Sequence, residues 1–270
     1  MTAGLWVLRQ REAERNAEHA VLAVSSLMCA ASTALTIRWC APMAAMDGMP
    51  MPGGWTMSMA WMRMPGQTWA GAAASLLAMW VVMMVAMMLP SLVPMVWRYR
   101  DAVSCADERR LGVLTAVVGI GYFWVWTLVG TVLIPLGFAL AAAEMRYPAL
   151  SRAVPIAAGA IVTIAGAWQL TAWKAHHLAC CREDAAALPA DAGAAWRHGM
   201  CLGLHCSACC AGLTTILLVM GVMDLRVMAA VTAAMTAERF APAGARVARA
   251  IGVLIVCAGV LLLARGAGFH

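Results

Sequence analysis

Charged residues are scarce in this 270-residue chain. Lys, Arg, Asp and Glu together make up 12% of it, whereas hydrophobic residues make up 63%. A soluble globular domain is nearer to a quarter charged and half apolar, so the composition excludes an ordinary soluble domain and indicates an integral membrane protein. The formal net charge of +6 therefore informs membrane topology rather than nucleic-acid binding, because basic residues flank apolar spans.

Motifs for nucleotide and hydrolase chemistry are also missing. The sequence contains no GxGxxG, no P-loop, no HExxH and no GxSxG, so it gives no basis for nucleotide or ordinary hydrolase chemistry. We find no clear cleavable signal peptide, because the N-terminal charged segment is long and the apolar run after it looks more like an anchor. A binding or transfer protein is therefore more expected than an enzyme, and whether the protein is an enzyme stays open.

Apolar runs predict an all-α fold, a polytopic transmembrane helix bundle that forms a single integral membrane domain over residues 1–270. About seven spans are expected, each reaching or approaching the ~20 residues needed to cross the bilayer. The predicted spans are His19–Ile37, Thr68–Trp97, Leu111–Ala143, Ala153–His177, Gly199–Val222, Leu225–Ala237 and Val247–Ala264. Around them, the predicted parts are a cytoplasmic tail (1–18), a methionine-rich outer loop (38–68) and the helix bundle (69–264).

The Lys and Arg residues predict the orientation of these spans. With the N-terminus in the cytoplasm, thirteen of the 19 Lys and Arg residues fall in cytoplasmic segments and six on the opposite side, as the positive-inside rule requires. This orientation, in a bacterial inner membrane, directs the methionine-rich loop outward. It also places the N-terminal end of the fifth span toward the cytoplasm.

The fifth span begins with CLGLHCSACC, residues 201–210, in which four cysteines and one histidine lie within ten positions. At ~100° per residue, one helix face carries His198, Cys201, His205 and Cys209, and a face about a quarter-turn away carries Cys206 and Cys210. Thiolates and imidazoles suit Cu(I) or Zn(II), although cysteine can also pack as a small apolar residue. The density of soft ligands favours a metal site.

A second cluster, HHLACC, ends the fourth span on the same predicted side of the membrane. Its His177 and Cys181 are four residues apart and are expected partners of the first cluster, although a histidine pair at a helix end can also be a solvated cap. Lys174 and Glu238 are expected near this face and could pair with each other, since an unpaired charge there is costly. With His198, we expect them to support the metal ligands.

Methionines form a third pattern, for which two interpretations stay open. Those of the second span are Met79, Met83 and Met87 in one stripe, with Met84 and Met88 beside it, and those of the outer loop include Met57, Met59, Met62 and Met64. Methionine commonly fills gaps in helix packing, but its thioether is also a soft ligand for Cu(I). The set is therefore either packing or a relay that carries Cu(I) inward.

Four stretches also resemble a known family. They are MPGQTW (64–69), MWVVMMVAMMLPS (79–91), the WQL…WK segment (168–174) with CRE downstream, and CLGLHCSACC with the following GL. Through them the sequence is similar to a bacterial family of uncharacterised integral membrane proteins that are predicted to bind metal. His177 stands where that family often has Cys, and Cys180 where His is common, so one soft ligand replaces another. The resemblance implies metal binding without specifying the metal.

Together these observations predict a membrane protein for the uptake, transfer or delivery of a soft metal, with copper favoured and zinc as the alternative. The expected ligands are Cys201, His205, Cys206, Cys209 and Cys210, joined by His177 and Cys181. Expected partners are the lipid bilayer and either a periplasmic metal donor or a membrane complex, with no nucleic acid. Two alternatives remain: a membrane thiol oxidoreductase that uses Cys206 and Cys209 as a CxxC pair, and a non-catalytic assembly partner of a membrane complex.

Overall fold

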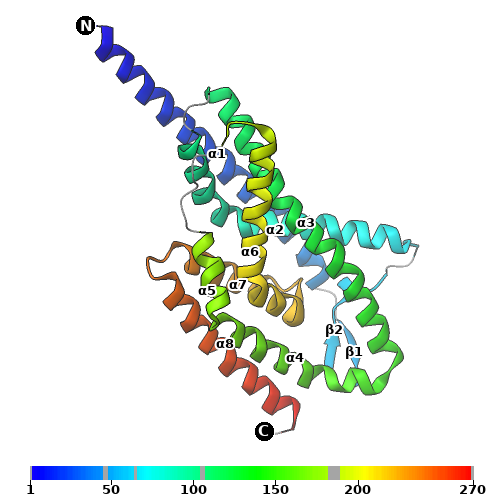
Figure 1. The fold of residues 1–270 in the computed structure, drawn as a ribbon. Coiled ribbons are helices and arrows are strands. Elements are labelled where there is room, and N and C mark those ends of the chain that lie inside the picture. The colour runs from blue at the N-terminus through cyan, green and yellow to red at the C-terminus, as the bar shows by residue number, and fades with distance from the viewer. Residues whose placement is uncertain (1, 45–47, 64–65, 104–106, 182–188, 269–270) are drawn as a thin grey trace.

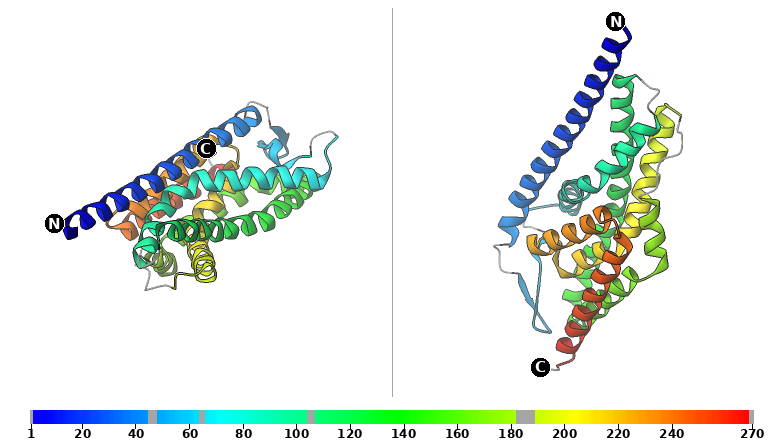
Figure 2. Two further views of the ribbon diagram at one scale, coloured as in Figure 1. Left: turned by 90° about the horizontal axis from the view of Figure 1, so that it is seen from above. Right: turned by 90° about the vertical axis from the view of Figure 1, so that its left-hand side faces the viewer.

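The computed structural model describes residues 2–44, 48–63, 66–103, 107–181 and 189–268, and it confirms the all-α helical bundle (Figure 1). The helices are α1 (Thr2–Ala44), α2 (Trp69–Ala102), α3 (Glu108–Arg146), α4 (Pro148–Gln169), α5 (Ala172–Cys180), α6 (Ala192–Gly221), α7 (Leu225–Phe240) and α8 (Gly244–Gly266). A two-stranded hairpin, β1 (Met49–Met51) and β2 (Trp55–Met57), and the short 3-10 helix η1 (Met59–Trp61) lie between α1 and α2. α1 packs along α2, and α8 packs along α4 (Figures 1 and 2).

Six helices of the described chain are long and apolar enough to cross a membrane, which is typical of a multi-pass membrane protein. These candidate spans are His19–Met43, Trp69–Ala102, Arg109–Arg146, Pro148–Gln169, Ala192–Gly221 and Gly244–Gly266. The remaining predicted span, Leu225–Ala237, is the 16-residue α7. At a rise of 1.5 Å per residue it is only ~24 Å long, short of the ~30 Å hydrocarbon core. α7 is therefore not a full span, and its C-terminal residues enter the bundle instead.

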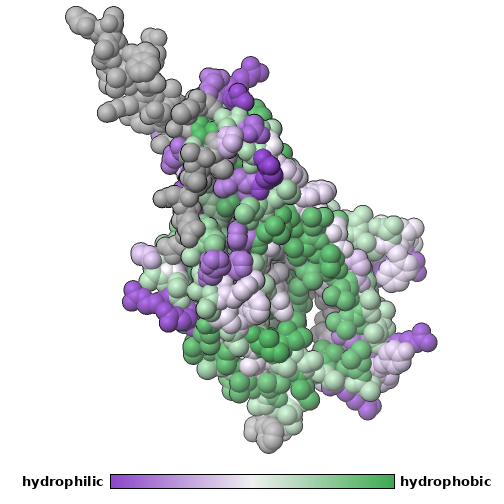
Figure 3. Space-filling model, viewed as in Figure 1, coloured by the Kyte–Doolittle hydropathy of each residue, from purple (hydrophilic) through white to green (hydrophobic). Residues whose placement is uncertain are grey.

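The surface of the bundle matches a lipid-facing role for its outer helices. Apolar residues cover broad areas of the visible face, and hydrophilic residues gather toward its ends and edges (Figure 3). Large exposed hydrophobic side chains follow α3 and α8, among them Ile120, Leu128, Val132, Leu136, Leu254 and Leu261. A hydrophobic side chain in this position gains no stability in water, so the pattern fits burial in lipid.

The main core surrounds α2. All five methionines predicted in its stripe are buried there, at 5% exposure or less: Met79, Met83, Met84, Met87 and Met88. The same core cluster contains Cys206, Cys209 and Cys210 of α6. The methionine stripe and the cysteines therefore meet inside the bundle.

The predicted fourth span, Ala153–His177, is broken into two helices. α4 ends at Gln169, and α5 begins at Ala172 after a cap in which the Thr171 side chain accepts a hydrogen bond from the backbone N–H of Lys174. Threonine and serine hydroxyls are favoured at this position because they satisfy a free N–H of the first turn. The break redirects the chain, so that α5 packs against α6.

The outer-loop region is not a simple loop. α1 extends to Ala44, and the hairpin docks onto the start of α4 through Ser151. The Trp55 indole donates to the Ser151 carbonyl at 2.9 Å, and the Ser151 hydroxyl donates to the Pro52 carbonyl at 3.0 Å. The hairpin thereby buries Met57 against α3.

Candidate metal centre

Helix α6 directs three thiols into the bundle. Cys206, Cys209 and Cys210 are spaced i, i+3 and i+4, which places their side chains on one helix face, and each is at most 1% exposed. The Cys209 thiol donates to the Cys206 carbonyl at 3.3 Å, and the sulfurs of Cys209 and Cys210 are 3.7 Å apart. All three are free cysteines. They form the thiol cluster, defined here as Cys206, Cys209 and Cys210.

Two glycines let α6 approach α3 closely enough for a side chain of α3 to contact the thiol cluster. A methyl group at Gly199 would lie 2.3 Å from the Val118 carbonyl oxygen, and one at Gly203 would lie 2.9 Å from that of Tyr122. Small residues at such contacts allow transmembrane helices to pack backbone against backbone. The close approach brings the Tyr122 hydroxyl to 2.8 Å from Cys206 Sγ.

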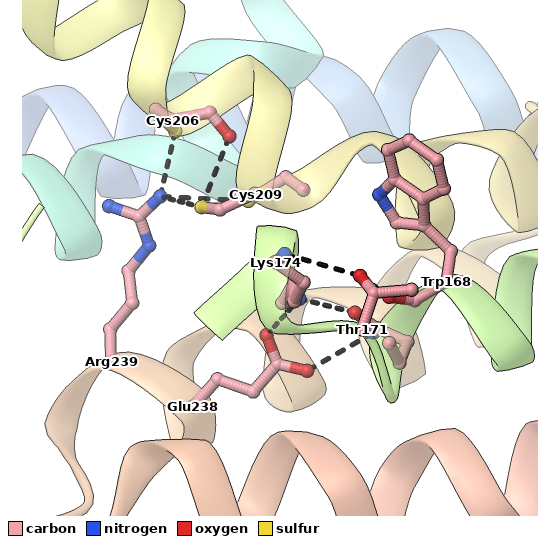
Figure 4. Close-up of polar contacts among 9 residues, drawn as sticks. Trp168, Thr171, Lys174, Cys206, Cys209, Glu238 and Arg239 are labelled. Carbon is pink, nitrogen blue, oxygen red and sulfur yellow. Dashed lines mark hydrogen bonds and ion pairs between the residues drawn. The ribbon is translucent and has the colours of Figure 1, made fainter. Parts of the chain in front are cut away.

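Arg239, near the end of α7, contacts all three sulfurs of the thiol cluster, and Figure 4 shows it with Cys206 and Cys209. Its Nη2 donates to the sulfurs of Cys206, Cys209 and Cys210 at 2.9, 3.2 and 3.6 Å. Its Nη1 lies 4.0 Å from Met95 Sδ on α2. The two N–H groups of Nη2 are shared among the three sulfurs, so Arg239 supplies a positive charge where thiolates would carry negative ones.

The preceding residue, Glu238, contacts a second buried polar group. Its Oε2 lies 2.7 Å from Lys174 Nζ, and its Oε1 accepts from Gln169 Nε2 at 3.1 Å. Lys174 also donates to Gln169 Oε1, and Figure 4 shows Lys174 and Glu238 beside the thiols. Burial raises the pKa of the Glu238 carboxyl, and the Lys174 charge opposes that shift. The ion pair expected between Lys174 and Glu238 is therefore present in the structure.

The two predicted histidine ligands form a pair of their own. His177 of α5 and His205 of α6 face each other with their Nδ1 atoms 2.9 Å apart and their ring centroids 5.2 Å apart. Trp173 packs on His177 with a centroid distance of 4.1 Å. Burial lowers the pKa of His177, and the neighbouring His205 and His176 lower it further. A lowered pKa favours the neutral imidazole, which is the form that binds metal.

Further sulfur atoms border the thiol cluster. Met88 Sδ of α2 lies 4.0 Å from Cys206 Sγ. Cys181, which follows α5, is 2% exposed and belongs to the same core cluster as the thiols of α6. Its predicted partner role is thus compatible with its position, and α2 and α5 both bring soft ligands to α6.

The structure does not bring every predicted ligand to this place. Cys201 is exposed on α6, and His198 stacks on Tyr99 with a centroid distance of 5.3 Å. His198 precedes Cys206 by eight residues, or ~12 Å along the helix. In the outer loop Met57 is buried in the hairpin, Met59 and Met62 are half-buried, and Met64 lies outside the described residues. One composite site from the sequence thus becomes a thiol cluster and a separate histidine pair.

Two residues at the thiol cluster were not found by sequence reasoning. Arg239 lies between the predicted spans Leu225–Ala237 and Val247–Ala264, and Tyr122 lies inside the predicted span Leu111–Ala143. The sequence does contain a feature that points to each of these two residues. Glu238 and Arg239 directly follow an apolar run shorter than a full span, and a tyrosine hydroxyl within a span needs a polar partner.

The chemistry of these donors suits a soft ion. Two sulfurs that bind one ion at ~2.3 Å with a near-tetrahedral angle lie ~3.8 Å apart, close to the 3.7 Å between Cys209 and Cys210. Among the described residues, no group of three or more His, Cys, Asp or Glu side chains is already arranged as a metal site. Binding at all three thiols therefore requires a rearrangement of these side chains.

Comparison with known proteins supports a role in copper handling. The profile of a family described as "PpoB2: Copper chaperone" matches residues 77–262. The matched region runs from α2 into α8 and includes the thiol cluster, Arg239 and the histidine pair. No curated protein and no solved structure matches the chain.

Proposed function

The chain belongs to the PpoB2 copper chaperone family, and from this membership we propose that it is an integral membrane chaperone that holds Cu(I) at the thiols of Cys206, Cys209 and Cys210. In this proposal Cu(I) is the cargo that the protein receives and delivers, and the protein is not an enzyme. The contact of one arginine nitrogen with all three buried sulfurs is the observation that carries it.

The charge balance explains why this contact matters. Cysteine binds metal as the thiolate, so loading releases protons from the thiols. Three thiolates and one Cu(I) would carry a net charge of about −2, which is costly in a low-dielectric interior. The positive charge of Arg239, at 2.9 Å from Cys206, offsets part of it. Thiolate sulfurs also select Cu(I) over harder ions.

The methionines suggest a route for the cargo. The stripe on α2 is continuous with the thiol cluster, because Met88 Sδ lies 4.0 Å from Cys206 Sγ. We propose that outer-loop methionines collect Cu(I) from a periplasmic donor and that the stripe passes it to the thiols. Packing remains the alternative explanation of the stripe, since methionine fills cores well.

The proposed setting is a bacterial inner membrane with the N-terminus in the cytoplasm. With α7 left out as a span, eleven of the 19 Lys and Arg residues fall on the cytoplasmic side and eight on the opposite side, so the positive-inside rule still favours this orientation, by a smaller margin than with seven spans. The placement of α5 and the start of α6 toward the cytoplasm depends only on the first four spans, which are all long apolar helices here. The short α7 comes later in the chain and leaves that placement unchanged.

Copper quantitation on the purified protein tests the proposal. The variant C206S/C209S/C210S should lose one equivalent of Cu(I) relative to wild type, together with the sulfur scattering in its X-ray absorption spectrum. Cys201→Ser is a matched control, because Cys201 lies on the same helix but is exposed, and it should bind as wild type. Stoichiometric zinc without copper would contradict the metal assignment. A thiol pair that cycles through a disulfide while binding no copper would support the oxidoreductase alternative.

A further inference from the structure

We propose that His177 and His205 form a second Cu(I) site, separate from the thiol cluster, in which the two imidazoles bind one ion from opposite sides. The identity of the metal in this inference rests on the proposed function. Its geometry is independent, because the Nδ1 atoms of the two rings face each other at 2.9 Å from two different helices.

The imidazole pair is set apart from the thiols by direction and by burial. His205 faces α5, whereas the next residue, Cys206, faces Tyr122 of α3 and Arg239 of α7. The thiols are fully buried and both imidazoles are only half-buried. Consecutive residues of α6 thus serve two sites, one inside the bundle and one at its boundary.

The pairing of the rings leaves a nitrogen lone pair for a metal. Across a contact between two neutral imidazoles, one nitrogen donates a proton and the other must accept it. When the donating ring carries its proton on Nε2 instead, both rings stay neutral and both Nδ1 lone pairs are free for one ion. An ion that binds two nitrogens at ~2.0 Å each would separate the Nδ1 atoms by about 1 Å, to lie ~4 Å apart. His177 lies in the last turn of the nine-residue α5, where a small shift of one ring is feasible.

The number of ligands restricts the ion. The described residues hold no ready-made group of three or more His, Cys, Asp or Glu ligands, so among them this pair offers two nitrogens. Zn(II) sites in proteins use four ligands, of which at least three come from the protein. Cu(I) accepts linear two-coordination, and imidazole is a good ligand for copper. Two facing imidazoles therefore fit Cu(I) better than zinc.

The position of the pair suggests what it does for the thiol cluster. His205 directly precedes Cys206 in α6, and His177 lies four residues before the buried Cys181. Because the imidazole pair is half-buried and lies beside the buried thiol cluster, it can exchange its ion with an outside acceptor without opening the bundle. We therefore assign the imidazole pair as the exchange site of the chaperone.

X-ray absorption and Cu(I) stoichiometry on the full-length protein in detergent separate the two sites. Wild type should bind about two equivalents, with nitrogen and sulfur scattering. H177Q/H205Q, whose amides can still hydrogen-bond to each other, should bind about one equivalent and lose the nitrogen component. C206S/C209S/C210S should retain that nitrogen component. His198→Gln, a histidine of α6 that stacks on Tyr99, should behave as wild type.

The outcomes distinguish this inference from the proposed function. If H177Q/H205Q binds as much copper as wild type with the same spectrum, the imidazole site is wrong while the thiol site stands. If H177Q/H205Q loses copper but C206S/C209S/C210S binds as much copper as wild type, the thiol site is wrong while the imidazole site stands. Should H177Q/H205Q fail to fold, the spectrum of C206S/C209S/C210S still decides, because sulfur-free copper with two nitrogen neighbours is expected there and its absence overturns the inference.

Discussion

Arg239 Nη2 lies 2.9 Å from the sulfur of Cys206, and these two groups join the short α7 to the ligand helix α6. The preceding residue, Glu238, forms an ion pair with Lys174 in the first turn of α5, just after the break between α4 and α5. Two consecutive side chains of α7 therefore complete two buried polar groups. A helix too short to span the membrane serves to carry charge into the bundle.

Removal of the arginine charge should weaken copper binding at the thiols. Arg239→Gln keeps a hydrogen-bond donor but leaves the thiolate charge uncompensated. Hydrogen bonds to charged groups contribute about 1.5–3 kcal/mol, so the Cu(I) affinity of the thiol cluster should fall roughly tenfold to a hundredfold. Competition with a Cu(I) chelator, carried out in the H177Q/H205Q background, measures this affinity alone.

Two further variants bracket that result. Arg239→Lys should fall between wild type and Arg239→Gln, because lysine keeps the charge but lacks the planar set of donors. Arg249→Gln removes an exposed arginine of α8 and should leave the affinity unchanged. Equal affinities for wild type and Arg239→Gln would mean that Arg239 does not compensate thiolate charge.

The buried ion pair should be sensitive to the loss of one partner. Lys174 and Glu238 are 1% and 2% exposed, and removal of one member of such a pair leaves a buried charge that costs about 3–5 kcal/mol. Lys174→Met should lower the free energy of unfolding by that amount. K174M/E238Q should recover much of it, because neither charge of the pair remains and the new amide can still bond to Gln169.

Denaturant unfolding in detergent, followed by circular dichroism, measures these differences. Arg197→Met is a suitable control, since Arg197 is exposed on α6, and it should change the unfolding free energy little. A double variant that is less stable than Lys174→Met would argue against a simple ion pair and for a structural need for the charge itself.

Much of the fold could be predicted because hydropathy and length decide it. Six apolar runs became long helices, as the need to satisfy backbone groups internally in lipid requires. The break at Thr171 and the shortness of α7 could not be predicted in the same way. Both depend on a local cap or on polar residues that find partners inside the bundle, and hydropathy averages over such residues.

The candidate site was predictable as a set of residue types but not as a geometry. The density of cysteines identified α6, and helical periodicity grouped Cys201, His205 and Cys209 on one face. The buried face is instead that of Cys206, Cys209 and Cys210. Periodicity gives relative angles only, and the direction that faces the core is set by Gly199 and Gly203 against α3.

The glycine contact of α6 with α3 should therefore control the thiol cluster. At Gly203 a methyl group would lie 2.9 Å from the Tyr122 carbonyl oxygen and from Val125 Cβ. Gly203→Ala should push the helices apart, destabilise the protein by about 1–3 kcal/mol and weaken Cu(I) binding at Cys206. Thermal unfolding and chelator competition on the same samples test both effects.

Gly119→Ala is the matched control for this prediction. Gly119 lies on α3, but a methyl group there meets nothing within 4 Å. Alanine is favoured over glycine inside a helix by about 1 kcal/mol or less, so this variant should be equal to or more stable than wild type. Equal destabilisation by both alanines would show that the effect comes from the helix backbone and not from the contact.

Replacement of Met88 by leucine separates a copper relay from simple packing in α2. Leucine conserves the volume of methionine, and such swaps in a core usually cost less than about 1.5 kcal/mol, so Met88→Leu should fold and bind copper at equilibrium nearly as wild type. The thioether 4.0 Å from Cys206 Sγ would be gone. If the stripe is a relay, Cu(I) added on the outer side of the membrane should load the protein in vesicles more slowly. The rate should fall on the order of tenfold, equivalent to ~1.4 kcal/mol in the transfer barrier.

Met145→Leu, at an exposed position of α3, is the control and should load at the rate of wild type. An unchanged rate for Met88→Leu would assign the buried methionines to packing.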